Sequence, residues 1–185
     1  MNKNTIVVNL YGGQGTGKST TMAGVFYYLK NHGVDCEMTP EFAKELVWEG
    51  RKETFQDELY LFAKQNHRLW RVNGKVDVVV TDHPLLMNVV YNNYYKPIKD
   101  SDWNNTFNDL VWFTYNQYNN INFMLERVKP YNPNGRNETE EEAKSFDIRF
   151  RECLDSYEIS YGTVTANEHA AEVIGETILK MLEKN

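Results

Sequence analysis

The stretch of sequence that decides the fold is residues 12–19, Gly-Gly-Gln-Gly-Thr-Gly-Lys-Ser. These eight residues fit the pattern G-x-x-x-x-G-K-[ST], a loop whose backbone N–H groups surround nucleotide phosphates. The motif needs a buried strand before it and a helix after it. Residues 5–11 (TIVVNLY) are short and β-branched, and residues 17–31 carry apolar side chains at helical spacing. A chance match in a chain of this length is roughly a one-in-a-hundred event, so the sequence predicts a P-loop.

The residue types in this loop predict how it binds ATP. Glycines let the backbone turn and approach the β-phosphate, helped by the helix N-terminus. Lys18 is expected to reach the β- and γ-phosphates, and the Ser19 hydroxyl is expected to ligate Mg²⁺. The alternative is a glycine-rich turn without a ligand. The predicted nucleotide-binding residues are Gly13, Gly15, Thr16, Gly17, Lys18, Ser19 and Thr20.

Outward from the loop, predicted strands alternate with predicted helices along the whole chain. Strands are expected at residues 5–11, 34–38, 76–81, 121–125 and 159–164. Helices are expected at residues 17–31, 41–49, 55–72, 84–95, 101–118, from about 142 to 156, and 167–183. This alternation predicts an α/β fold, the P-loop NTPase three-layer sandwich, with a mainly parallel five-stranded sheet in one domain spanning residues 1–185. Ligands of such sheets bind beyond the carboxyl ends of the strands.

Two carboxylates follow predicted buried strands at that edge. Asp82 comes directly after residues 76–81, where a carboxylate lies beside the Mg²⁺ or its waters, so Asp82 and Ser19 are the predicted metal-side residues. Glu41 follows the second strand, on the acceptor side, and is expected to take a proton from an attacking hydroxyl. The alternatives are structural: Asp82 caps the helix that Pro84 opens, and Glu41 is a first-turn acid.

A loop rich in Pro, Asn, Gly and Glu at residues 129–142 is expected to form the centre of a lid at about residues 126–150. Basic residues in and around this segment would close over the transferring phosphoryl group and exclude water. Arg127 and Arg136 are the two predicted to act there. The alternative is an ordinary solvated loop, because glutamates at positions 138 and 140–142 nearly balance its charge.

Composition excludes several classes of protein. The net charge is −6, from 20 Lys+Arg and 26 Asp+Glu, which disfavours a duplex DNA partner without excluding a local basic groove. No apolar run approaches the length of a membrane span, and the N-terminal residues lack the features of a signal peptide. Cys36 and Cys153 have no metal or redox spacing and are expected to be reduced thiols. A cytoplasmic protein without a membrane partner is expected; a homodimer stays open.

Four segments together resemble the small AAA-type P-loop kinases related to ribosylnicotinamide kinase, which are common in phage genomes: GGQGTGKST, PEFAKEL, the strand ending in TDHP, and NPNGR…FDIR. The resemblance covers nearly the whole chain in element order, although only the P-loop is specific. It extends to the wider nucleoside and nucleotide kinases, and implies a strand-end acid, a metal-side Asp and lid arginines. These roles correspond to Glu41, Asp82, Arg127 and Arg136. His83 departs from the pattern, because many nucleotide kinases carry Arg there.

The acceptor side gives weaker signals. Arg68 and Arg71 would contact a phosphate if the acceptor were a monophosphate, although a solvated helix face is the simpler interpretation. Tyr91, Tyr94 and Tyr95 are able to stack on a base, but aromatic residues at helical spacing are more often core. His83 is interpreted as a residue with a local hydrogen bond.

The sequence therefore predicts an ATP- and Mg²⁺-dependent phosphotransferase acting on a nucleoside or nucleoside monophosphate. The predicted catalytic residues are Lys18, Glu41, Asp82, Arg127 and Arg136. One alternative is a phage DNA-directed kinase of a modified base, against which the net negative charge speaks. Another is a nucleotide-dependent regulatory ATPase. Against that alternative, the chain has no Asn-Lys-x-Asp guanine-binding motif, and 185 residues hardly accommodate the second domain of an oligomeric motor.

Overall fold

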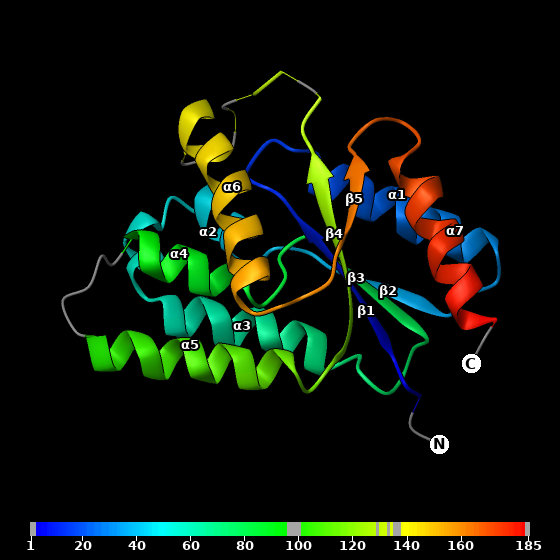
Figure 1. The fold of residues 1–185 in the computed structure, drawn as a ribbon, viewed down its shortest axis with the longest axis horizontal. Coiled ribbons are helices and arrows are strands. Elements are labelled where there is room, and N and C mark those ends of the chain that lie inside the picture. Colours follow the sequence, from blue (N-terminus) through cyan, green and yellow to red (C-terminus); the bar gives the residue numbers. More distant parts are fainter. Residues whose placement is uncertain (1–2, 96–100, 129, 133, 135–137, 184–185) are drawn as a thin grey trace.

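Five parallel strands form a single sheet at the centre of the computed structural model (Figure 1). The structure describes every residue except 1–2, 96–100, 129, 133, 135–137 and 184–185. The spatial order is β2-β3-β1-β4-β5, and all neighbouring pairs are parallel. The strands are β1 (Ile6–Tyr11), β2 (Cys36–Thr39), β3 (Val78–Thr81), β4 (Asn119–Glu126) and β5 (Gly162–Thr165).

Helices cover both faces of this sheet (Figure 1). On one face lie α1 (Lys18–Asn31) and α7 (Ala170–Leu182). On the other lie α3 (Glu58–Trp70), α4 (Met87–Tyr95), α5 (Ser101–Tyr115) and α6 (Glu140–Ser156). The short α2 (Ala43–Trp48) and the 3-10 helix η1 (Lys52–Gln56) connect β2 to α3. The expected three-layer sandwich is confirmed, and its sheet is entirely parallel.

The alternation of side chains along each strand explains why both faces need a covering layer. Val7 and Val79 pack on the side of α3 to α6, whereas Val8 and Val80 pack against α1 and α7. All four are fully buried. A parallel sheet buried on both faces reads as continuous apolar runs, which is the pattern of its central strands.

Several predicted boundaries differ from the structure by two or three residues, and three of the differences have a local cause. Residues 55–72 do not form one helix, because η1 ends at Gln56 and the Asp57 side chain then caps α3 by accepting a hydrogen bond from the Tyr60 N–H at 3.1 Å. The loop predicted to reach residue 142 ends earlier, because Thr139 and Glu142 form a capping box that starts α6 at Glu140. The last strand begins at Gly162 rather than at residue 159, because residue 159 still belongs to the segment that connects α6 to β5.

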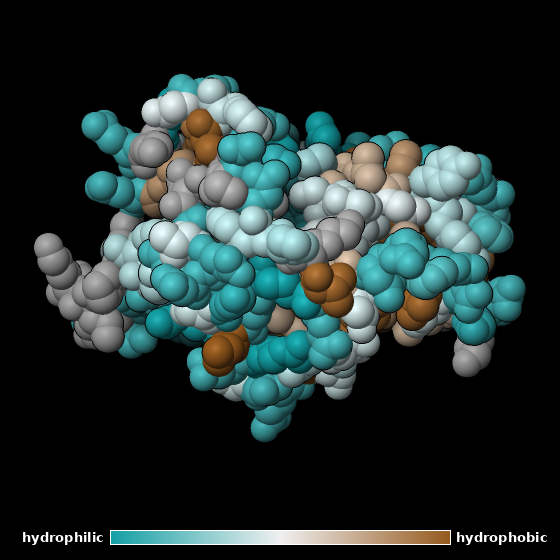
Figure 2. Space-filling model, turned by 90° about the horizontal axis from the view of Figure 1, so that it is seen from above, coloured by the Kyte–Doolittle hydropathy of each residue, from teal (hydrophilic) through white to brown (hydrophobic). Residues whose placement is uncertain are grey.

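The carboxyl ends of the strands bring distant segments together at the upper edge of the sheet. Thr81 is in register with Thr39 of β2 and with Asn9 of β1, so the residues that follow these strands emerge side by side. Figure 2 views the molecule over this edge, where hydrophilic side chains cover most of the face and apolar ones form small separate groups. Among the described residues, no helix combines the length and apolar character that crossing a membrane requires.

Candidate functional site

The loop between β1 and α1 has the backbone geometry that the sequence predicts. Gly15 and Gly17 have φ of 78° and 112°, in the left-handed region that favours glycine. The Lys18 ammonium lies inside the loop, where it donates hydrogen bonds to the carbonyl oxygens of Gly12 at 2.6 Å and Gly13 at 3.3 Å. Burial lowers the pKa of Lys18, although nearby carboxylates oppose the shift. The Lys18 ammonium therefore lies where the P-loop motif binds phosphates.

Ser19 and Asp82 meet directly, although they lie 63 residues apart. The Ser19 hydroxyl donates to Asp82 Oδ2 at 2.5 Å, and the backbone N–H of Glu41 donates to Oδ1 at 2.9 Å. Hydroxyl and carboxylate oxygens are ligands that Mg²⁺ prefers, so this pair fits the predicted metal side. The described residues contain no group of three or more His, Cys, Asp or Glu side chains able to hold a metal. An ion here would complete its coordination with phosphates and water, as Mg²⁺ usually does.

Glu41 is paired with His83, the residue that departs from the kinase pattern. The Nδ1 atom of His83 lies 3.5 Å from Glu41 Oε1, an ion-pair contact longer than a well-formed hydrogen bond. Burial opposes the charged form of Glu41, but His83 and Lys18 outweigh it and hold the pKa of Glu41 below its usual value. Burial likewise opposes the charge on His83, yet Glu41 raises its pKa. The carboxylate of Glu41 is therefore ionised at neutral pH.

Arg127 packs on the P-loop from the end of β4. Its Nη1 donates to the Gln14 carbonyl at 2.8 Å, and its Nη2 donates to Asp147 Oδ2 at 3.0 Å. The other oxygen of Asp147 accepts a hydrogen bond from the Gly13 N–H at 2.5 Å. The sequence analysis missed Asp147, which lies in the quoted FDIR segment of α6. Arg136, the other predicted lid arginine, lies outside the described residues.

Two further predicted loop residues have distinct positions. Thr16 is fully buried and its hydroxyl donates to the Gly13 carbonyl at 2.6 Å, which ties the loop to itself. Thr20 is exposed and lines the open cleft beside the loop. Gly13 has no room for a side chain, since a Cβ atom there would lie 2.0 Å from the Ala143 carbonyl oxygen of α6.

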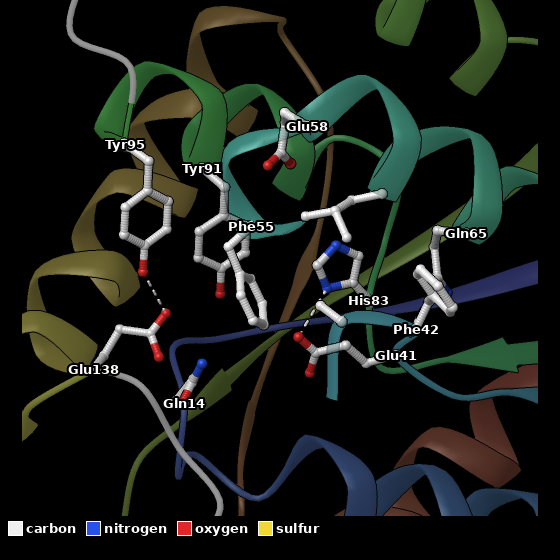
Figure 3. A pocket seen from close by; sticks show the side chains of 12 residues that line it. Gln14, Glu41, Phe42, Phe55, Glu58, Gln65, His83, Tyr91, Tyr95 and Glu138 are labelled. Atoms are coloured by element: carbon white, nitrogen blue, oxygen red, sulfur yellow. Dashed lines mark hydrogen bonds and ion pairs between the residues drawn. The ribbon is translucent and has the colours of Figure 1, made fainter. Parts of the chain in front are cut away.

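Two pockets adjoin at this edge of the sheet. The first, with about 750 Å³ of empty space up to its open mouth, follows the P-loop and includes Lys18, Ser19 and Lys44. The second lies between η1, α3, α4 and the segment before α6 (Figure 3), and its about 450 Å³ of empty space includes open solvent at its mouth. Both are lined by Gln14, Glu41 and Phe55. A molecule in the second pocket would therefore contact the same glutamate as a molecule in the first.

The second pocket is acidic and aromatic. No lysine or arginine belongs to its described lining, and Arg68 is engaged elsewhere, donating to the Pro40 carbonyl at 2.9 Å and to Glu45 at 2.6 Å. Tyr91, assigned to the core, is buried and also lines this pocket. Apart from Glu41, its carboxylates and aromatic rings were not predicted as site residues, since they come from five separate parts of the chain: the start of α2, η1, α3, α4 and the segment before α6. They are Glu58, Glu138, Phe42, Phe55, Tyr91 and Tyr95.

Comparisons with known proteins agree with this architecture. A family model described as an AAA domain matches residues 7–171. No curated protein matches the sequence. The NadR protein solved in complex with NR superposes with a TM-score of 0.69 at 17% identity, covering 94% of this chain and 51% of the NadR chain. NadR in complex with NAD and AMP-PNP superposes with a TM-score of 0.67 at 17% identity, covering 94% and 49%. This chain thus spans about half the length of NadR, and the likeness shows a shared fold.

Proposed function

The chain belongs to the AAA domain family, and from this premise we propose that it is an ATP- and Mg²⁺-dependent kinase of a nucleoside or nucleoside monophosphate. The observation that carries the proposal is the position of Glu41, which lines both the P-loop cleft and the neighbouring acidic pocket. Phosphoryl transfer needs the attacking and leaving oxygens in line, with donor and acceptor bound in adjoining sites. The two pockets adjoin and share Glu41, which supports the proposal.

The donor side consists of the P-loop and the residues that steady it. Backbone N–H groups of the loop and the Lys18 ammonium would bind the phosphates of ATP. Ser19 and Asp82 would hold Mg²⁺, which supplies neutralisation of phosphate charge when bound. Arg127 keeps the loop in place through the Gln14 carbonyl and Asp147. We include Arg136 as the lid arginine that would contact the transferring group.

The acceptor side supplies a base and a ring-binding surface. An ionised Glu41 accepts the proton of the attacking hydroxyl, and His83 maintains that ionisation. Phe42, Phe55 and Tyr91 offer apolar faces for a planar base. NR is the first acceptor to test, because the NadR protein that was solved with NR has a similar fold.

The test is transfer of label from [γ-³²P]ATP in the presence and absence of Mg²⁺. Candidate acceptors are NR, the common ribo- and 2′-deoxyribonucleosides, their 5′-monophosphates, and short DNA. The expected result is Mg²⁺-dependent labelling of a small molecule by the wild-type protein and none by Lys18→Ala. Labelled DNA would instead identify a DNA-directed kinase. Release of phosphate with no labelled acceptor would identify a regulatory ATPase.

A further inference from the structure

A buried glutamate lies in the acceptor pocket, on the wall opposite Glu41 (Figure 3). Glu138 directly precedes the cap of α6 and is 7% exposed. Its Oε1 atom accepts a hydrogen bond from the Tyr95 hydroxyl at 2.8 Å. Figure 3 shows its carboxylate facing the pocket interior near Gln14 and Tyr91. The chain therefore places a buried carboxyl group where an acceptor would bind.

The second oxygen of this carboxylate has no protein partner. Glu138 Oε2 is buried and makes no hydrogen bond within the described part of the chain. Buried polar atoms in folded proteins nearly always have a partner, because leaving one unpaired costs the desolvation of that atom. Glu138 itself lines the pocket. A donor group on a bound molecule would complete its hydrogen bonding.

The charge of the pocket limits which charged groups a bound molecule can carry. Glu41, Glu58 and Glu138 all line it, and the basic side chain of its described lining is His83, which is paired with Glu41. Burial is the main cause that raises the pKa of Glu138, and the negative charge of Glu41 adds to it. A phosphate dianion entering this space would add negative charge to a pocket that already disfavours it, which is unfavourable at low effective dielectric.

We propose that Glu138, held by Tyr95, recognises a hydroxyl or N–H donor of an unphosphorylated nucleoside and makes the pocket reject nucleoside monophosphates. This inference rests on the proposed function and narrows its acceptor to one class. A pocket built to accept a hydrogen bond discriminates strongly against molecules that cannot donate one, because its own buried oxygen is then left unpaired. Glu138 is therefore a specificity-determining residue, distinct from the base Glu41.

The decisive variant is Glu138→Gln, with Glu142→Gln as the matched control. Glu142 also accepts a hydrogen bond from a tyrosine of α4, Tyr94 at 3.0 Å, but it does not line the pocket. Both substitutions exchange one carboxylate oxygen for an amide, so general effects on charge and on the contact between α4 and α6 are common to both. Tyr95→Phe is a second variant, which frees the Glu138 carboxylate without changing the charge.

The readouts are kcat and KM for NR and for the common nucleosides and their 5′-monophosphates. In the wild type, the preferred nucleoside should exceed its monophosphate at least tenfold in kcat/KM. Glu138→Gln and Tyr95→Phe should raise the KM of that nucleoside about tenfold or more and leave the KM for ATP unchanged. The ratio of kcat/KM for the nucleoside to kcat/KM for its monophosphate should fall. Glu142→Gln should stay within about twofold of wild type. A wild-type preference for monophosphates, or equal effects of the two glutamine variants, would overturn the proposal.

Thermal-shift binding separates this inference from the kinase function. If no panel compound is phosphorylated but a nucleoside stabilises the wild type and not Glu138→Gln, the kinase function fails while the recognition subsite stands. If no nucleoside and no monophosphate shifts the melting temperature of the wild type, the subsite is refuted even where ATP binds. Transfer to a nucleoside with unchanged KM in Glu138→Gln refutes the subsite and leaves the kinase function intact.

Discussion

Asp147 and Arg127 form an ion pair of 3.0 Å that rests on the P-loop, since the same Asp147 carboxylate accepts the Gly13 N–H and the same guanidinium donates to the Gln14 carbonyl. The Asp147 carboxylate of α6 thus holds both the Gly13 N–H of the P-loop and the Arg127 guanidinium, which follows β4. The side chains of Asp147 and Arg127 are only 21% and 11% exposed, so solvent screens the pair weakly. Two residues that lie outside residues 12–19 therefore stabilise the P-loop.

The first prediction concerns this pair. Asp147→Ala and Arg127→Ala should each lower the free energy of unfolding and raise the KM for ATP, because the loop loses its outside support. A double-mutant cycle should give a coupling energy within about 0.5–3 kcal/mol. The control cycle is Arg68→Ala with Glu45→Ala, a 2.6 Å pair whose glutamate is largely exposed, where about 0–1 kcal/mol is expected. Equal coupling in the two cycles would contradict the assigned role of Asp147.

The second prediction tests the close approach of α6 to Gly13. Gly13→Ala would bring a Cβ atom to 2.0 Å from the Ala143 carbonyl oxygen, so the helix backbone must move. Overpacking of this kind costs roughly 1–3 kcal/mol, and ATP binding should weaken together with stability. Gly33→Ala is the control, since nothing lies within 4 Å of its Cβ and only the positive φ of 76° is strained. Its melting temperature should fall while ATP affinity stays unchanged.

The third prediction separates metal from nucleotide binding. Asp82→Asn should raise the Mg²⁺ concentration for half-maximal activity by about 10–100-fold, the range for residues that support a metal site. Binding of AMP-PNP in EDTA, measured by calorimetry, should change little. A Mg²⁺ titration identical to that of the wild type would assign Asp82 to the support of the Glu41 backbone alone.

The fourth prediction concerns the base. Glu41→Gln should keep ATP and acceptor binding but lower kcat by roughly 10²–10⁴-fold. A raised acceptor KM at unchanged kcat would mean that Glu41 binds hydroxyl groups of the acceptor instead of taking a proton. A small effect on kcat alone is compatible with an orienting role, because a loose transition state needs little deprotonation.

The fifth prediction is a shift of the pH profile in His83→Gln. In the wild type His83 holds the pKa of Glu41 below its usual value. Without the imidazole, burial remains and raises the pKa of Glu41, since the charged form is disfavoured in a buried site. The acid limb of kcat/KM should therefore move to higher pH in the variant. A limb at the same pH as in the wild type would exclude His83 as the group that sets this ionisation.

How far the sequence predicts the site depends on where each residue lies in the chain. Ser19 and Asp82 were predicted to meet because each adjoins a strand that an apolar run makes recognisable, and parallel strands end at one edge. Asp147 and Glu138 follow no strand, and they reach the site only through the packing of α6, which approaches Gly13 from 134 residues away. No local sequence pattern indicates such a contact. Likewise, the helix predicted at residues 55–72 missed the N-cap of α3 at Asp57, because a single Asp in a polar segment does not by itself indicate a helix start.

The division of the two pockets between different elements bears on how this protein could change its substrate over evolution. The P-loop cleft depends on the loop and its immediate supports, whereas the walls of the acceptor pocket come from η1, α3, α4 and the start of α6. Substitutions on those helices can reshape the pocket for another acceptor without disturbing the bonds around Lys18. Gln14, Glu41 and Phe55 are the exceptions, because they belong to both. We therefore expect substitutions to accumulate slowly at these three positions and faster at the other residues that line the acceptor pocket.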